Sequence, residues 1–396
     1  MFSTSLLAAY AFDSAETVIL WLTVAVVAAL LIAGIAIFFA KRDVFAKYAK
    51  YGTLGFTAYA LIAGIVMCIL QLVKRTNEQY LEDKWVNKDV IGYVIVPLLV
   101  LFGVLLASGI ALFVISKLKP ASFKVSAFVL SGVSAVALVA AIVTISLYYS
   151  AHISNDGYYS EKMNQTGLYV STAVLIVATA VAAVLLGLKD KSGFDNRCIA
   201  LAGITIAMSF VLSYVKLWEM PQGGSITFVS LLPIMIFAYV YGTKKGVIVG
   251  LIYGIMQAMQ DCYIIHPAQF LLDYPIAFAM VGFAGSFKLI KALDKLPQIQ
   301  FALGAVLAGC LRFLAHLFSG VFAFAANTPE GQNFWAYSAA YNSFVFIDIA
   351  LVIVAGVVIF SSKSFIKAMN RYASKKTPIA QEAVAEEAAP ATDVAD

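Results

Sequence analysis

The chain has 396 residues, of which 62% are hydrophobic and only 12% are charged, and its mean hydropathy is +0.90. Because soluble domains are about 45–50% apolar and about 25% charged, this composition excludes a water-soluble globule, a disordered chain and a coiled coil. The net charge of +5 is unevenly distributed, since residues 377–396 carry five acids and no base. The remaining basic body, with its few charges, is typical of an integral membrane protein whose Lys and Arg lie in inner loops.

Eleven apolar runs predict an all-α integral membrane protein, because a transmembrane helix needs about 20 mostly apolar residues. The seventh and eighth runs are short. The runs lie near residues 17–40, 52–73, 91–116, 125–149, 167–188, 198–216, 228–241, 246–260, 268–287, 300–325 and 337–361.

A charged break, KDKSGFDNR at residues 189–197, separates the first five runs from the last six. We therefore predict a five-helix transmembrane module over residues 1–190 and a six-helix module over residues 191–362. The first module consists largely of Ala, Val, Leu and Ile, and its sequence assigns it no role. Residues 363–396 are predicted to form a basic and then acidic, disordered cytoplasmic tail.

Lys and Arg concentrate in alternate loops, beginning with the loop after the first helix. One of the intervening loops, residues 74–90, carries four bases but also four acids. Because short cytoplasmic loops are enriched in Lys and Arg, the pattern predicts a multi-pass cell-membrane protein with its N-terminus outside and its C-terminus cytoplasmic. The cysteines and histidines show no CxxC or HxxxH spacing, so no structural metal site is expected.

Asp273 is an acid within an apolar run, about six residues after its start in HPAQFLLDYPIAFAM. An ionisable residue at membrane depth is costly and by default faces an interior site. Pro267 suits the first turn of this helix, and Pro275 predicts a kink near Leu271, because proline donates no hydrogen bond and clashes one turn back. The alternative is that Asp273 lies near the outer interface and reaches water.

Four residues spaced by four, Arg312, His316, Gly320 and Phe324, lie along one slowly drifting helix face. A base, an imidazole, a glycine and an aromatic ring on one face indicate a binding wall, in which Gly320 lets a flat ligand approach the backbone. The alternative is that Arg312 pairs with an acid in a neighbouring helix and that His316 is a satisfied core histidine.

The last apolar run opens with Tyr337, Ser338, Tyr341 and Asn342, in NFWAYSAAYNSF. Ser338 and Asn342 are neighbours on the helix surface because they are four residues apart. An interfacial aromatic belt is the alternative explanation for the tyrosines. It does not account for Asn342, which lies deeper and carries an amide that needs partners.

The loop KLWEMPQGGSIT, residues 216–227, is the longest clear outer loop of the second module. Its two glycines permit unusual backbone angles. We interpret Trp218 either as a lid over a pocket or as an anchor among lipid headgroups, with no preference between the two.

Small residues repeat every four positions on two helices of the second module. The first set is Gly246, Gly250 and Gly254, which predicts close helix packing in lipid. The second set is Gly203 and Ala207 on the preceding helix, which form a small face that could meet a partner protein.

Five segments of the second module occur together in a recognisable order: PQGGSIT, YGTKKG, HPAQFLLDYPIAFAMVGFAG, LRFLAHLFSG and TPEGQNFWAYSAAYN. They resemble the thiamine-specific S-component of energy-coupling factor (ECF) transporters over roughly residues 198–362. The resemblance implies a six-helix, non-enzymatic domain that binds thiamine at its outer side and associates with a T-component and two ATPase subunits. The chain has no GxxxxGK[ST] motif, which agrees with ATP hydrolysis by these partners. We expect no cofactor in the chain itself.

The resemblance also implies a set of thiamine-binding residues. The family's residues correspond to Tyr263, Asp273, Tyr274, Arg312, His316, Gly320, Tyr337, Ser338 and Asn342. The chain departs from the family where it carries Asp273, Arg312 and Phe324, since the family has Glu, Lys and Trp there. The family's first-loop tryptophan does not align cleanly with Trp218. Gly203 and Ala207 lie on the helix that such proteins turn towards the T-component.

The chemistry of these residues suits thiamine, which has a permanently cationic thiazolium and an aminopyrimidine. Asp273 can accept a hydrogen bond from the amino group or balance the charge, and Asn342 can donate and accept along the pyrimidine edge. Phe324, Tyr337 and Trp218 offer aromatic faces for stacking and cation–π contacts, worth about 0.5–2 kcal/mol each.

Two other functions remain open from the sequence. The chain could be a self-sufficient secondary transporter of thiamine or a precursor, with the first module replacing the T-component. It could also be a membrane sensor or enzyme in which the first module acts when the vitamin binds. A thiamine precursor or phosphate ester is an alternative ligand, and Arg312 would favour a phosphate.

Overall fold

The computed structural model describes residues 4–75, 77, 87–188, 190, 193–220, 223–260 and 263–373. Within these ranges nine helices are long and apolar enough to cross a membrane. Two further helices correspond to the seventh and eighth predicted runs, α9 (Leu232–Tyr241) and α10 (Thr243–Gln260). The prediction of an all-α, multi-pass membrane protein is therefore confirmed, and α9 is short as predicted, whereas α10, with 18 residues, is as long as the helix over Asn196–Ser213.

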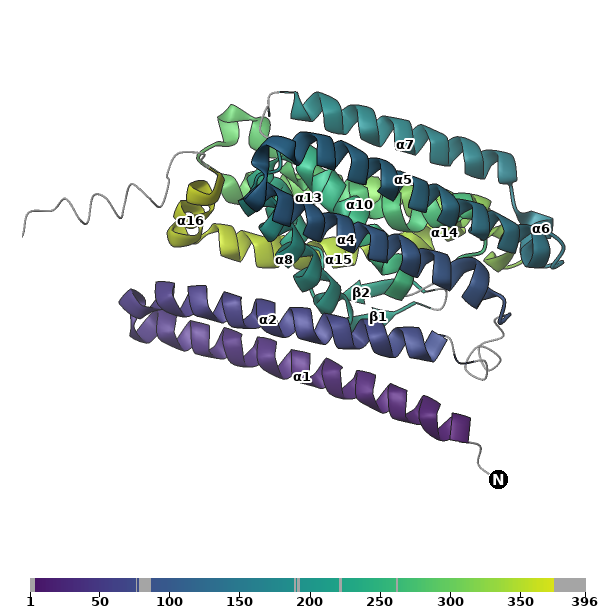
Figure 1. Ribbon diagram of the computed structural model, residues 1–396, viewed down its shortest axis with the longest axis horizontal. Coiled ribbons are helices and arrows are strands. Elements are labelled where there is room, and N and C mark those ends of the chain that lie inside the picture. Colours follow the sequence, from purple (N-terminus) through teal and green to yellow (C-terminus); the bar gives the residue numbers. More distant parts are fainter. Residues whose placement is uncertain are drawn as a thin grey trace, which may run out of the picture.

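The N-terminal module is built from two antiparallel helix hairpins and one further long helix (Figure 1). Its outward-facing positions are apolar along most of each helix, as expected for a surface in contact with lipid. Its elements are α1 (Thr4–Ala40), α2 (Arg42–Arg75), η1 (Ile91–Ile95), α4 (Val96–Leu118), η2 (Pro120–Ser122), α5 (Phe123–Tyr148), η3 (Tyr149–Ile153), α6 (Tyr159–Lys162) and α7 (Gln165–Gly187).

The second module contains six spans, and a two-stranded hairpin follows the first of them. Two of the spans are assembled from several consecutive helical pieces. In addition to α9 and α10, its elements are α8 (Asn196–Ser213), β1 (Lys216–Glu219), β2 (Ser225–Thr227), α11 (Pro267–Leu271), η4 (Leu272–Ile276), α12 (Ala277–Ala279), η5 (Met280–Leu289), η6 (Lys291–Leu293), α13 (Pro297–Phe322), η7 (Ala325–Asn327), α14 (Phe334–Asn342) and α15 (Phe344–Phe360).

Helix α13 lies at the centre of the second module and divides it into an apolar and a polar half. In its first half Phe301 is fully buried and stacks on Phe360 with ring centroids 4.7 Å apart. Its second half carries Arg312, His316 and Ser319, which face a cavity. Packing in the apolar half thus holds the helices together at one end, and the opposite ends of the same helices form the polar site.

The span from Pro267 to Leu289 is irregular where the sequence predicts a kink. The α-helix α11 ends at Leu271, and a wider π-helical turn, η4, follows around Pro275. Proline cannot donate the hydrogen bond that would continue a regular helix, so the backbone changes its pitch here. The turn contains Asp273 and places this carboxylate among side chains from α11 and α13.

The glycines of α10 pack against this irregular span, as predicted. A Cβ atom on Gly250 would collide with the carbonyl group of Phe278, and one on Gly254 would collide with that of Tyr274. Only a residue without a side chain permits this approach. The close packing holds the π-helical turn and its carboxylate in place.

The outer loop of the second module forms an antiparallel hairpin of β1 and β2, in which Lys216 pairs with Thr227 and Glu219 with Ser225. Gly223, in the connecting turn, has a φ of +91°. This left-handed backbone conformation is accessible to glycine at no steric cost, which explains one of the two glycines in the loop.

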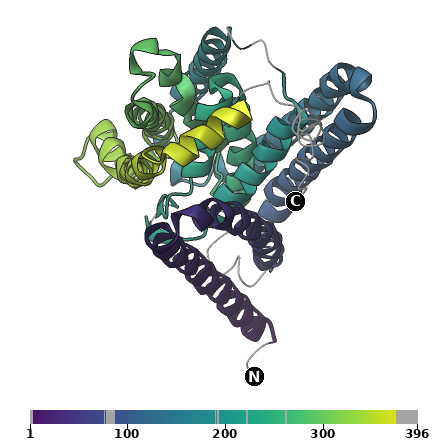
Figure 2. The same cartoon turned by 90° about the vertical axis from the view of Figure 1, so that its left-hand side faces the viewer.

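The N-terminal helices pack around the second module instead of forming one separate body (Figures 1 and 2). The hairpin of α1 and α2 contacts α8, the hairpin of α4 and α5 contacts α8, α10 and α11, and α7 contacts α10, α11 and α13. An ion pair joins the two modules, because Lys245 at the start of α10 donates to Asp190 at 2.8 Å. Gly187 at the end of α7 lies against Lys244, where a Cβ atom would sit 2.8 Å from the lysine Cβ. The first module therefore packs directly against the wall of the second.

The beginning of the predicted disordered tail is instead a helix. Residues Lys363–Ala373 form α16, which lies across one end of the bundle (Figure 2). Phe365 and Ile366 pack against the core of the second module, and Met369 is buried. This apolar face explains why the segment forms a helix that packs on the bundle, because its basic residues alternate with side chains that can be buried. The acidic stretch from residue 377 lies outside the described residues.

Candidate ligand-binding site

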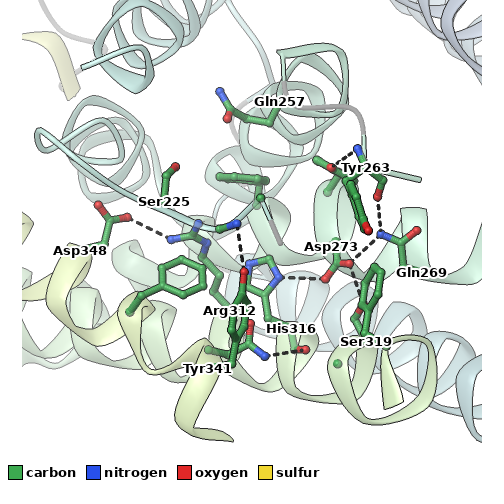
Figure 3. A pocket seen from close by; sticks show the side chains of 18 of the residues that line it. Ser225, Gln257, Tyr263, Gln269, Asp273, Arg312, His316, Ser319, Tyr341 and Asp348 are labelled. Carbon is green, nitrogen blue, oxygen red and sulfur yellow. Dashed lines mark hydrogen bonds and ion pairs between the residues drawn. The ribbon is translucent and has the colours of Figure 1, made fainter. Parts of the chain in front are cut away.

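A cavity that opens to solvent lies in the polar half of the second module, and its empty volume is about 1040 Å³ when the space at its open side is included. Its walls come from the β1–β2 hairpin, α10, the Pro267–Leu289 span, α13, α14 and α15 (Figure 3). Of the side chains predicted to bind ligand, all except Trp218 line it. The lining residues from the prediction are Tyr263, Asp273, Tyr274, Arg312, His316, Gly320, Phe324, Tyr337, Ser338 and Asn342.

Asp273 is the centre of a hydrogen-bond cluster in this cavity (Figure 3). Its Oδ1 accepts from His316 Nδ1 at 3.0 Å, and its Oδ2 accepts from Ser319 Oγ at 2.6 Å and Gln269 Nε2 at 2.8 Å. Gln269 also donates to the backbone carbonyl of Tyr263 at 3.0 Å. Asp273 thus faces the cavity and is held by α11 and α13, as the interior-site interpretation predicts; its depth relative to the membrane interface stays a prediction.

Arg312 is neutralised by a second carboxylate deeper in the cavity. Its Nη1 donates to Asp348 Oδ2 at 3.1 Å, and its guanidinium lies 4.9 Å from the centre of the Phe278 ring. Asp348 Oδ1 accepts from the backbone N–H and the hydroxyl of Thr227 at 3.1 and 3.0 Å. The alternative for Arg312, pairing with an acid of a neighbouring helix, is therefore confirmed, and the same acid anchors β2 over the cavity.

Gly320 allows α14 to approach α13. A Cβ atom on Gly320 would collide with Ser338 Oγ and lie 3.2 Å from Asn342 Nδ2. Ser338 donates to the carbonyl of Leu317 at 2.9 Å, and Asn342 Nδ2 donates to the carbonyls of Ser338 and His316 at 2.9 and 3.3 Å. The Nδ2 group of Asn342 is thus engaged within the protein, so its carbonyl oxygen is the more available group for a ligand, and its role in ligand binding stays a prediction.

Aromatic side chains gather where α10 leads into the Pro267–Leu289 span and where α13 ends. The Tyr263 and Phe324 rings lie 5.7 Å apart at an angle of 36°, and both line the cavity. The Tyr274 hydroxyl accepts from the backbone N–H of Tyr263 at 3.1 Å. Tyr274, which follows Asp273 in the sequence, thus helps to fix the position of Tyr263 in the preceding loop.

The hairpin covers the cavity from another side. The backbone N–H of Gly224 donates to the hydroxyl of Tyr341 at 3.4 Å. A Cβ atom on Gly224 would lie 2.8 Å from the Phe344 ring, so this glycine is required for close approach of the loop. Ser225, next in the chain, lines the cavity (Figure 3).

Trp218 is not among the residues that line the cavity, so its role as a lid or as a headgroup anchor stays a prediction. It is on β1 and 65% exposed. Strand β2 rather than β1 contributes lining residues, because Asp348 binds Thr227 and holds β2 on the cavity side.

Several lining residues escaped the sequence analysis because their partners are distant in sequence. Asp348 is the clearest case, and its signal was an acid in the apolar stretch FVFIDIALVIV. Ser319 and Gln269 gave no such signal, since Ser and Gln are tolerated in membrane helices. Tyr341, assigned to either a pocket or an aromatic belt, lines the cavity.

The small face on α8 is open at one position. A Cβ atom on Gly203 would meet no atom of the described part of the chain within 4 Å, and Ala207 is partly buried. Further along α8, α2 covers Val211, which lies 3.3 Å from the position of a Cβ on Gly64. The partner-binding role of Gly203 and Ala207 stays a prediction.

Two buried nitrogen atoms in the cavity wall have no hydrogen-bond partner among the described residues, His316 Nε2 and Arg312 Nε. Buried polar atoms are nearly always satisfied in folded proteins. Together with the carboxylates and aromatic rings around them, these atoms equip the cavity to bind a small polar molecule with an aromatic part.

Comparisons with known proteins match the module that holds this cavity. Residues 199–369 match the family described as thiamine transporter protein (Thia_YuaJ). The thiamine transporter ThiT of Bacillus subtilis (strain 168) is 36% identical over 156 residues, which are 37% of this chain and 80% of that protein. ThiT of Lacticaseibacillus paracasei is 28% identical over 141 residues, 33% of this chain and 70% of that protein.

Among solved structures, ThiT from Listeria monocytogenes is similar at 21% identity and a TM-score of 0.36, over 45% of this chain and 94% of its own. Residues 1–198 lie outside the family match. On the identity and coverage of its relatives, the chain belongs to the thiamine transporter family.

Proposed function

We propose that this protein is the high-affinity thiamine-binding subunit of an ATP-driven, ECF-type vitamin importer. Its relatives are named as thiamine transporters, a non-enzymatic function. The observation that carries the choice of ligand is the cavity built around Asp273, whose carboxylate is held by three side chains and faces a group of aromatic rings.

The charge of the cavity favours a cation. Asp273 and Asp348 contribute two carboxylates and Arg312 one guanidinium, so the formal charge is −1 with His316 neutral. Thiamine carries one permanent positive charge on its thiazolium ring. The field of the uncompensated Asp273 carboxylate attracts this ring, and the low dielectric of the cavity strengthens the attraction.

The state of Arg312 disfavours a phosphate ester as the ligand. A phosphate would need a free base, but this guanidinium is already paired with Asp348 at 3.1 Å and stacked near Phe278. A phosphate would also bring negative charge next to Asp273. We therefore expect the unphosphorylated vitamin to bind better than its monophosphate.

The polar groups left unsatisfied in the cavity suit the aminopyrimidine. His316 Nε2 is buried without a partner in the described part of the chain, and with Nδ1 donating to Asp273 it acts as an acceptor. The carbonyl oxygen of Asn342 is a second acceptor. An exocyclic amino group offers two N–H donors, which these acceptors can receive.

The aromatic residues suit both rings of thiamine. Tyr263, Phe324, Tyr337 and Tyr341 line the cavity. A cation over an aromatic face gains about 0.5–2 kcal/mol per contact, more where water is excluded. We infer that these faces hold the thiazolium while the acceptors orient the pyrimidine.

Energy would come from partner subunits. The sequence contains no P-loop, so we propose a T-component and two ATPases as partners, with Gly203 and Ala207 on the T-component side. The chain itself would need no cofactor. The positive-inside pattern supports an N-terminus outside the cell and a cytoplasmic C-terminus.

Calorimetric titration of the purified protein in detergent tests this function. We expect saturable one-to-one binding of thiamine and at least about tenfold weaker binding of thiamine monophosphate, because a like charge near Asp273 costs more than about 1.4 kcal/mol. Absence of thiamine binding would overturn the proposed ligand. Uptake of thiamine in cells lacking every ECF ATPase would overturn the proposed energy source.

A further inference from the structure

The segment that joins α5 and η3 to α7 belongs to the N-terminal module, yet it contacts the cavity wall of the second module. The hydroxyl groups of Tyr159 and Tyr263 are hydrogen-bonded to each other. The neighbouring Tyr158 donates through its hydroxyl to Asn327 Oδ1 at 3.0 Å. Both Tyr263 and Asn327 line the cavity. The first module therefore touches two of the residues that a bound molecule would meet.

The Tyr159 ring supports the same wall through an aromatic contact. It meets the Phe324 ring edge-on, with centroids 6.1 Å apart at an angle of 81°. Phe324 in turn lies 5.7 Å from Tyr263, so the three rings form one continuous group. Tyr159 itself does not line the cavity and stands behind the two rings that do. Burial raises the pKa of the Tyr159 hydroxyl, in keeping with a group withdrawn from water.

The segment is firmly held around Tyr159. Asp156 Oδ1 accepts from the backbone N–H groups of Tyr158 and Ser160 at 3.0 and 3.1 Å, which fixes the turn before Tyr159. After it, the backbone N–H of Asn164 donates to the carbonyl of Phe322 at 2.9 Å, at the end of α13. The ring of Tyr159 is therefore presented from a rigid turn that is bonded to the second module.

A rigid support behind a pocket wall affects release of a ligand more than its entry. Tyr263 and Phe324 are both in contact with Tyr159, so a bound molecule that leaves past these two rings would have to displace rings that Tyr159 supports. The family match begins at residue 199, so the region that the relatives share does not contain this tyrosine. Any effect of Tyr159 on ligand release would therefore be a property of the N-terminal module, which lies outside the family match.

We propose that Tyr159 is a positioning residue of the N-terminal module, which holds Tyr263 and Phe324 as one wall of the ligand cavity and thereby slows release of the ligand. This rests on the function proposed above, with thiamine as the ligand. It gives residues 1–190 a first role in the handling of that ligand.

Dissociation of labelled thiamine from the full-length protein, after addition of excess unlabelled thiamine, tests this role. Tyr159→Ala removes ring and hydroxyl, and about tenfold faster dissociation is expected. Tyr159→Phe removes only the hydrogen bond, and about threefold faster dissociation is expected. The control is Tyr51→Phe, an exposed tyrosine on α2 of the same module, which should leave the rate unchanged.

A second measurement separates positioning from general stability. Tyr159→Phe and Tyr263→Phe break the same hydrogen bond, so the double variant should dissociate no faster than the faster single variant. Wild-type dissociation rates in Tyr159→Ala and Tyr159→Phe would overturn the role of Tyr159 alone, as would independent, multiplying effects of the two Phe substitutions. Absence of thiamine binding by the wild type would overturn the proposed function and this role with it.

Discussion

The buried pair of Arg312 and Asp348 gives a quantitative prediction about stability. Their side chains are 8% and 2% exposed, and the Asp348 carboxylate accepts from Arg312 and twice from Thr227. Asp348→Asn removes the countercharge of a guanidinium that water hardly reaches. Breaking a buried pair on one side costs about 3–5 kcal/mol, because an uncompensated charge stays buried. We expect a loss of this size in the free energy of unfolding.

The matched variant removes both charges. Arg312→Met combined with Asp348→Leu leaves no buried charge, although Thr227 loses its acceptor at a cost of about 1–3 kcal/mol. The double variant should therefore be more stable than Asp348→Asn. Unfolding in mixed detergent micelles, followed by loss of helical circular dichroism, measures the free energies of the wild type, of Asp348→Asn, of the single variants Arg312→Met and Asp348→Leu, and of the double variant. A double variant that loses the sum of the two single losses would refute the pairing argument, because independent sites add.

Three further predictions concern other parts of the chain. Gly203→Leu should leave thiamine binding intact and reduce uptake at least about tenfold, since a Cβ atom there meets no atom of the described residues within 4 Å and the larger side chain would obstruct the proposed partner; loss of binding in detergent would contradict this. Gly250→Ala should lower the free energy of unfolding by at least about 3 kcal/mol, the upper end of the usual cost of overpacking, because the added Cβ collides with the backbone carbonyl of Phe278. A thermal melt like that of the wild type would refute the close packing. Burial lowers the pKa of His266 to about 4, below its usual value of 6.5. As the pH falls from 7.5 to 5, the imidazole of His266 becomes protonated in the unfolded chain but stays neutral in the folded protein. Protonation therefore favours the unfolded chain, and the free energy of unfolding should fall by about 2 kcal/mol over this range. His266→Asn keeps a helix-capping side chain and should lose this part of the pH dependence; an equal slope in both proteins would be inconsistent with a buried neutral imidazole.

The spans could be predicted from the sequence because the membrane imposes a strong local signal on each helix. The kink before Pro275 is also local, since one proline determines where the regular helix ends. Arg312 and His316 could be assigned to one face from their spacing alone, and both line the cavity. The glycine repeat containing Gly250 predicted close packing without revealing its partner.

The interactions between helices could not be predicted, because they depend on how spans distant in sequence are placed. The pairing of Arg312 with Asp348 joins two helices, and spacing along one chain does not reveal it. The position of Trp218 outside the cavity lining could not be predicted, because a loop sequence does not show which strand of a hairpin faces inward. Tyr159 carried no signal at all, since its partner Tyr263 lies 104 residues away.

The measurement that bears most directly on the binding site is calorimetry of thiamine binding to Asp273→Asn beside Asp273→Glu. The Asn variant keeps the size of the side chain but loses the charge, and its NH₂ group replaces one of the two oxygens that accept from His316, Ser319 and Gln269. Hydrogen bonds to charged groups contribute about 1.5–3 kcal/mol, so we predict affinity at least about tenfold below that of the wild type for Asn and near-normal affinity for Glu. Wild-type affinity in the Asn variant would contradict the assignment of Asp273 as the anionic centre of the site.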